Sequence, residues 1–136
     1  MLVLLGLAGC ASEPAPVEKV DDNLVAARVM ACYDKLNRQD WLGHANCYQT
    51  DSLKAWLDKH DMGQAEQTPA QRFAHYLSKQ PAQGVVEVKV LRVTPQDQGY
   101  LVLVESITRR SAKMQQSWTQ TIHLSDARDG LTLLMQ

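Results

Sequence analysis

The side chains with the clearest chemistry in this 136-residue chain are three cysteines, Cys10, Cys32 and Cys47. In a secreted protein an odd number of cysteines leaves one without a disulfide partner, and that one needs an explanation. Cys32 and Cys47 are predicted to form a disulfide in an oxidising compartment, provided that their Cα atoms lie within about 7 Å of each other. The alternative is two buried free thiols. A metal site is not expected at these cysteines, because neither belongs to a C-x-x-C pair and no histidine lies at ligand spacing beside them.

The histidines are scattered along the sequence and form no H-x-x-x-H pair, so they predict no metal site either. Each is interpreted as a surface or interface residue. The chain also lacks a Gly-rich phosphate loop and a G-x-S-x-G nucleophile elbow, and no cofactor is expected. The histidines are His44, His60, His75 and His123.

The first twenty residues have the pattern of an export signal followed by a tether. Residues 2–7 are an apolar run, and Leu7-Ala8-Gly9-Cys10 resembles the lipobox of bacterial lipoproteins. The resemblance implies a signal peptide over residues 1–9, acylation of Cys10 by palmitate-like chains, and attachment to the periplasmic face of the outer membrane. Residues 11–20 contain two prolines and no apolar face, which predicts a flexible tether. The alternative is a buried N-terminal strand or helix.

Residues 21–136 are sufficient for one domain with one core. The whole chain has 14 basic and 15 acidic residues, a net charge of −1 and no basic block, so no nucleic-acid partner is expected. The apolar fraction of 45% is typical of a globular protein and too high for a disordered one.

Helical periodicity dominates the first half of this domain. Val25, Val29 and Leu36 recur at helical spacing and predict a helix over residues 22–38. Thr68-Pro69 is a capping residue followed by a first-turn proline, which indicates the start of another helix. Helices are expected in addition over residues 41–48, 53–60 and 69–79.

From residue 85 the apolar period changes to two, which is typical of strands. A phase shift after Val90 indicates either a β-bulge or a strand end that is covered on both sides. Four antiparallel strands are expected after the helices, an order that indicates an α+β fold with N-terminal helices packed on a curved four-stranded sheet. The expected strands cover residues 85–93, 100–108, 114–124 and 131–135.

The order of elements, the size, and the signature Tyr33-x-x-Leu36-x-x-x-Asp40 leading into Tyr48 resemble the NTF2-like superfamily of cone-shaped, cystatin-like domains. The sequence departs from that pattern because no strand is evident between the early helices. The resemblance implies a cone between helices and sheet, which is a catalytic pocket in ketosteroid isomerases and dehydratases and a core or binding cavity in other members. Another two-layer α+β domain is the alternative.

An isomerase needs a carboxylate base facing a tyrosine or a protonated acid across an apolar cavity. Asp40, Asp51, Tyr33 and Tyr48 are the nearest candidates, but helix capping and helix packing account for them better, and no catalytic residue is predicted. The candidate pocket consists of aromatic residues that are core candidates first. They are Tyr33, Trp41, Tyr48, Trp56, Phe73 and Trp118.

The hypothesis from the sequence is a non-catalytic binding or interaction domain, an accessory subunit of an envelope assembly with an envelope protein or a small apolar ligand as partner. The alternatives are an enzyme of the isomerase or dehydratase type and a subunit that only positions a complex. The polar face of the third strand favours a homodimer over a monomer, since NTF2-like sheets often pair face to face. That face carries Gln115, Ser117, Thr119 and Thr121.

Overall fold

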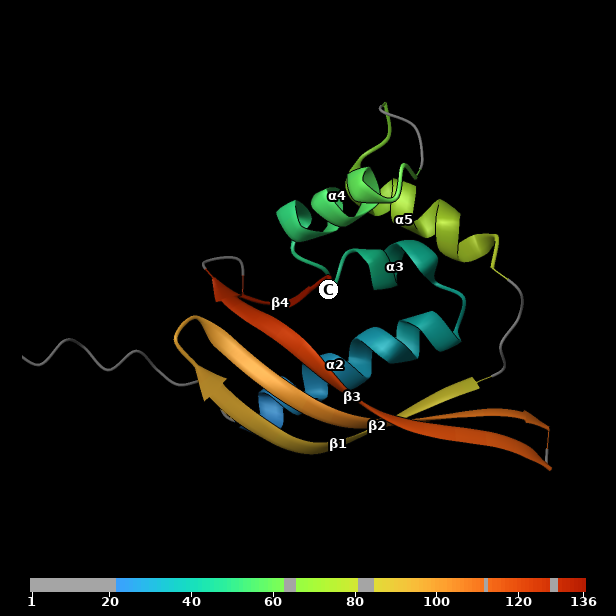
Figure 1. The fold of residues 1–136 in the computed structure, drawn as a ribbon, viewed down its shortest axis with the longest axis vertical. Coiled ribbons are helices and arrows are strands. Elements are labelled where there is room, and N and C mark those ends of the chain that lie inside the picture. The colour runs from blue at the N-terminus through green and yellow to red at the C-terminus, as the bar shows by residue number, and fades with distance from the viewer. Residues whose placement is uncertain (1–21, 63–65, 81–84, 112, 128–129) are drawn as a thin grey trace, which may run out of the picture.

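The computed structural model describes residues 22–62, 66–80, 85–111, 113–127 and 130–136. It contains helices followed by an antiparallel sheet of order β1-β2-β3-β4, which confirms the predicted α+β fold (Figure 1). No helix among these residues is long and apolar enough to cross a membrane. Cys10 and the tether lie outside the described residues. The elements are α2 (Asp22–Asn37), α3 (Trp41–Ala45), α4 (Thr50–Lys59), α5 (Pro69–Ser78), β1 (Val85–Gln96), β2 (Gly99–Ser111), β3 (Met114–Ala127) and β4 (Gly130–Leu134).

Capping side chains fix where the short helices begin. Before α5, the Thr68 hydroxyl accepts a hydrogen bond from the Gln71 backbone N–H, and the Gln71 side chain accepts one from the Thr68 N–H, as a capping box requires. For α4, which begins at residue 50, the Gln49 side chain is the cap and accepts a hydrogen bond from the Ser52 N–H at 2.7 Å.

The sheet is a meander in which each strand pairs with the next one in sequence. The register of β1 against β2 shifts between Val90 and Arg92, which confirms the predicted bulge. The segment before α4 also joins the sheet, since the Gln49 N–H donates to the Leu133 carbonyl and the Leu133 N–H donates to the Cys47 carbonyl. Tyr48 and Leu133 thus form an isolated parallel β-bridge. It lies between α3 and α4, where no strand was evident in the sequence.

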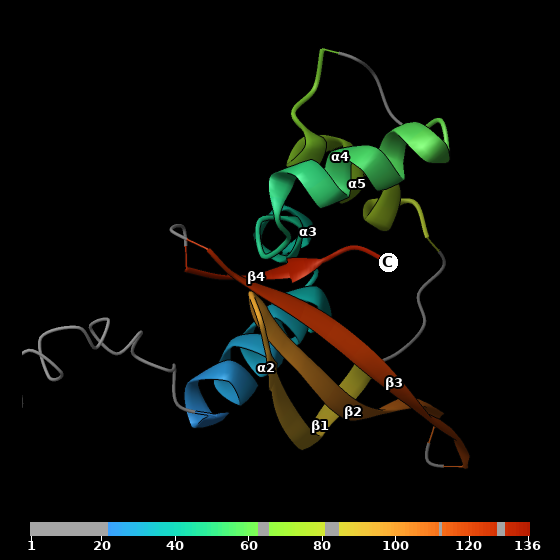
Figure 2. The ribbon, with the colours of Figure 1, turned by 60° about the vertical axis from the view of Figure 1, so that its left-hand side comes forward.

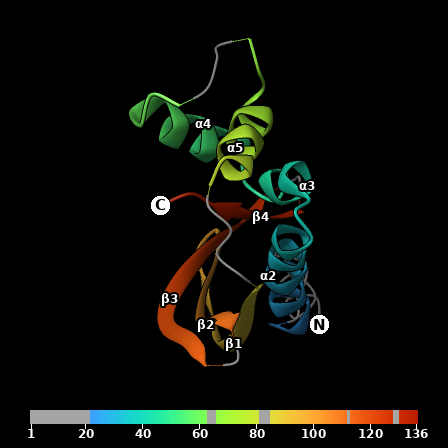
Figure 3. The same cartoon turned by 90° about the vertical axis from the view of Figure 1, so that its right-hand side faces the viewer.

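Two hydrophobic clusters form the core. The first lies between α2 and the concave face of the sheet, and the second lies among α3, α4 and α5 (Figures 2 and 3). Tyr48 packs against both clusters and so connects them. The end of the β2–β3 hairpin extends away from the helices in Figures 1 and 2, and on β3 Met114 and Trp118 are 60% and 44% exposed.

The predicted disulfide between Cys32 and Cys47 is confirmed. Their Cα atoms are 6.1 Å apart, and both side chains are buried in the first cluster. The bond joins α2 to the segment before α4, and that segment pairs with β4. The disulfide therefore connects α2, this segment and β4.

Reduction of this disulfide is expected to lower the free energy of unfolding by about 3 kcal/mol, because the closed loop of 15 residues no longer restricts the unfolded chain. Urea unfolding with and without reductant measures this difference. The double variant Cys32→Ala/Cys47→Ala is the control, since reductant should leave its stability unchanged. Equal stability of the oxidised and reduced wild-type chains would contradict the prediction.

Candidate functional site

A buried histidine lies at the junction of α2 and α3. His44 is 2% exposed, which corrects the sequence prediction of a surface or interface residue. Its Nδ1–H donates a hydrogen bond of 2.7 Å to the Cys32 carbonyl, because a carbonyl oxygen can only accept. Burial lowers the pKa of His44 below its ordinary value of 6.5. The ring is therefore neutral near pH 7, and its Nε2 is an acceptor.

The Tyr48 hydroxyl oxygen lies 3.5 Å from His44 Nε2 and can donate its proton toward that nitrogen. Burial, with a smaller contribution from Tyr33, raises the pKa of Tyr48 far above its ordinary value. The two side chains therefore form a neutral pair of a base and a phenol inside the fold.

A second polar group lies between α2 and the concave face of the sheet. Ser106 on β2 is fully buried, and the Gln120 side chain on β3 donates a hydrogen bond of 3.0 Å to its Oγ. Burial raises the pKa of Tyr33, and a hydrogen bond from the Gln120 side chain opposes that shift. Tyr33 also contacts His44 edge to face, at a ring-centroid distance of 5.6 Å, so the two polar groups meet at Tyr33.

Ring contacts continue from this polar group into the second cluster. Tyr48 contacts Phe73 at 5.4 Å, and Phe73 contacts Trp56 at 5.7 Å, both edge to face. Tyr76 stacks on Phe73 at 6.1 Å. The result is a row of contacting rings that runs from Tyr33 on α2 to Trp56 on α4.

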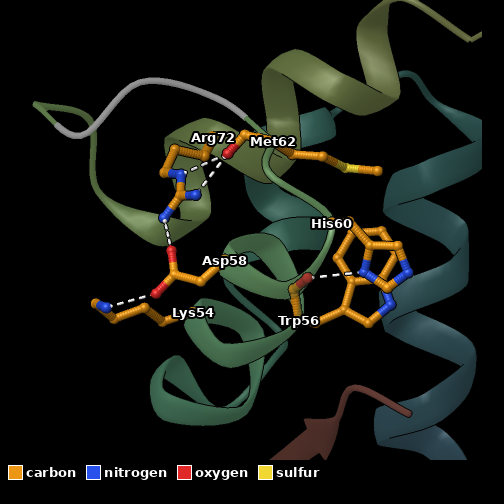
Figure 4. Close-up of polar contacts among 6 residues, drawn as sticks. All are labelled: Lys54, Trp56, Asp58, His60, Met62 and Arg72. Carbon is orange, nitrogen blue, oxygen red and sulfur yellow. Dashed lines mark hydrogen bonds and ion pairs between the residues drawn. The ribbon is translucent and has the colours of Figure 1, made fainter.

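Near Trp56, at the end of this row of rings, polar contacts join α4 and α5 (Figure 4). The Arg72 guanidinium donates to the Met62 carbonyl and binds the Asp58 carboxylate, which also binds Lys54. Hydrogen bonds from Lys54 and Arg72 lower the pKa of Asp58. Arg72 thus joins α5 to both the end of α4 and the residues that follow it, whereas Asp58 faces solvent.

The structure joins four of the six predicted pocket residues through ring contacts, namely Tyr33, Tyr48, Phe73 and Trp56. The other two lie apart. Trp41 is half-buried at the start of α3, and Trp118 is 44% exposed on β3.

The two carboxylates considered for isomerase chemistry lie at helix starts and are exposed. Asp40 caps α3 by accepting a hydrogen bond of 3.0 Å from the Gly43 N–H, and Asp51 belongs to the first turn of α4. Neither has a contact with the Tyr33–His44–Tyr48 group that would make it the base of an isomerase.

Two surface hollows lie outside this group. One, of about 630 Å³, is at the β1–β2 turn and is lined by residues that include Gln98, Tyr100, His123 and Leu134. The other, of about 240 Å³, is at the β2–β3 turn beside Thr108 and Met114. Neither is lined by Tyr33, His44 or Tyr48.

Sequence reasoning did not find His44, Ser106 or Gln120. His44 stands between Gly43 and Ala45 in a short helix that has no clear apolar period, and its partner is a backbone carbonyl on another helix. Ser106 was detectable in principle, because it interrupts the apolar strand around Val104 and Ile107. A serine in such a strand must find a hydrogen-bond partner.

His44 is expected to make the stability of the fold depend on pH. Its folded-state pKa lies below the unfolded value, so the unfolded chain binds more protons as the pH falls below 6.5 and the free energy of unfolding decreases. In His44→Gln this decrease between about pH 8 and pH 5 should be smaller, and the variant should be roughly 1–3 kcal/mol less stable at pH 8 through loss of the Cys32 contact. Urea unfolding at several pH values measures both effects.

His75→Gln is the matched control, since His75 is exposed on α5. The same pH dependence in His44→Gln as in the wild-type chain would refute the role of His44.

No family model matches the chain, and no curated protein matches it significantly. A solved structure is similar, the crystal structure of an NTF-2 like protein of unknown function from Shewanella oneidensis MR-1. The match has a TM-score of 0.58 and 13% sequence identity, and it covers 82% of this chain and 92% of that chain. At this identity the similarity concerns the fold alone. The domain therefore has the NTF2-like fold.

Proposed function

We propose that this protein is a lipid-anchored envelope protein whose NTF2-like domain binds a partner protein without catalysing a reaction, as an accessory subunit of a larger assembly. The anchor is supported by the lipobox-like Leu7-Ala8-Gly9-Cys10 and by the proline-containing tether that follows. The Cys32–Cys47 disulfide also fits an exported protein, because such bonds persist in the oxidising periplasm.

The closed polar network inside the fold supports a function without catalysis. Among the described residues, every buried side-chain nitrogen or oxygen has a hydrogen-bond partner. The Ser106 hydroxyl accepts a hydrogen bond from Gln120, and His44 uses one ring nitrogen on the Cys32 carbonyl while the other faces Tyr48. These groups are satisfied by one another, whereas a substrate site holds polar groups that converge on the ligand.

An enzyme of the dehydratase or isomerase type is the second candidate. It is favoured by one observation, the neutral His44 whose Nε2 faces the Tyr48 hydroxyl. A buried base beside a phenol is a pair that can transfer protons. The base would then be His44 and not Asp40 or Asp51, the nearest carboxylate candidates in the sequence.

The anchor is tested by Cys10→Ser in the native cell. We expect the wild-type protein to fractionate with membranes and to incorporate labelled palmitate, and the variant to lose both properties, because Cys10 would carry the acyl chains. Cys32→Ala/Cys47→Ala is the control and should stay in the membrane fraction. Wild-type protein that is soluble and unlabelled would refute the anchor.

Native mass spectrometry of the protein purified from its membranes separates the two candidates. A domain whose interior is closed should carry no small molecule beyond its acyl chains. An added small-molecule mass that disappears in His44→Gln and Tyr48→Phe would overturn the non-catalytic proposal and favour the enzyme.

A further inference from the structure

The two edges of the sheet differ in how they are protected. An unprotected edge presents backbone N–H and C=O groups to which another strand can pair, and proteins block such edges with charges, proline, bulges or covering side chains. On β1, Asn37 covers the edge, since its side chain donates to the Val86 carbonyl at 2.6 Å and accepts from the Val86 N–H at 2.9 Å. The bulge after Val90 interrupts the rest of this edge. The same strand also contains Glu87, Lys89, Arg92 and Pro95.

Within the part of the chain that the structure describes, residues 114–122 at the opposite edge have none of these devices on their outer side, and the register shift of β2 against β3 lies on β2, between Arg109 and Ser111. β4 pairs with β3 only over His123–Ala127, so within the described residues no strand pairs with the outer side of residues 114–122. In Figure 3 this part of β3 borders the sheet below β4. The Met135 N–H donates to Ser52 Oγ, which directs the chain after β4 toward α4 and away from this edge.

The nine residues of this free edge read MQQSWTQTI, with no charge, proline or glycine. Residues 114–119 and 121 are exposed. Such a segment spans about 30 Å and has the composition that pairs readily with another strand.

We propose that this edge, residues 114–122 of β3, pairs antiparallel with the same edge of a second copy, with a twofold axis at Trp118. Only this register aligns all nine residues of one copy with all nine of the other, because a shift in one direction would bring the partner strand against β4 and a shift in the other would leave edge residues unpaired beyond the β2–β3 turn. The two sheets then form one continuous sheet. This contact joins edges, unlike the face-to-face dimer expected from the sequence.

The residues that meet in this register match in chemistry. Trp118 lies opposite its own copy, Gln116 opposite Gln120, and Ser117 opposite Thr119, while Met114 meets Ile122. Aromatic pairs and hydroxyl pairs directly across strands stabilise a sheet, and no like charges face each other. The pairing also accounts for a tryptophan that is 44% exposed on β3.

The test uses the purified full chain with Cys10→Ser, so that no acyl group drives association. Sedimentation velocity over a dilution series should show a dimer. Ser117→Lys/Thr119→Lys places lysines opposite lysines and should weaken the dimer at least about tenfold. The matched control, Thr94→Lys/Gln96→Lys, adds the same charges at exposed positions on β1 and should leave the dimer unchanged.

Cross-linking tests the register without relying on the lysine variant. Under mild oxidation a mixture of the Ser117→Cys and Thr119→Cys chains should form a disulfide-linked dimer, whereas each chain alone should not, because residue 117 faces residue 119 of the other copy. A monomer at all concentrations, a dimer that the lysines do not weaken, or cross-links within one variant alone would each overturn the proposal.

Discussion

The fold depends on the covalent and polar contacts of Cys32. Its sulfur binds Cys47, and its carbonyl accepts the hydrogen bond of His44. These two bonds fix α3 and the following segment against α2, and that segment in turn pairs with β4 through Cys47 and Gln49. Tyr48, which lies between the two paired residues, is thereby placed where both hydrophobic clusters meet.

Periodicity was enough to locate the elements, because burial of one face imposes a pattern that is visible in each segment by itself. The capping box at Thr68 and the bulge after Val90 were predictable for the same reason, since each depends on neighbouring residues. The burial of His44 was not predictable, because it depends on a carbonyl 12 residues away on another helix. Met114 and Trp118 alternate as core residues would, yet they are exposed because α2 covers only part of the long sheet.

The candidate site shows why an aromatic signature is a weak guide to chemistry. Tyr33, Tyr48, Phe73 and Trp56 lie together as the sequence suggested, but they contact one another, and His44 lies between Tyr33 and Tyr48. The polar residues among them are neutral at pH 7, since burial lowers the pKa of His44 and raises the pKa values of Tyr33 and Tyr48. A buried neutral network rigidifies a fold and selects one packing arrangement.

Gln120 relates this closed interior to the open edge of the sheet. Its side chain binds Ser106 inside the domain, while its backbone belongs to the free segment of β3. The Gln120 side chain also hydrogen-bonds the phenol of Tyr33, so it contacts α2 as well. A strand that pairs with this edge would therefore bind the backbone of Gln120. The side chain of Gln120 already connects the sheet to α2. In the proposed dimer, the interior would hold the curved segment 114–122 in a fixed and accessible shape, so that less conformational freedom is lost when a partner strand pairs with it.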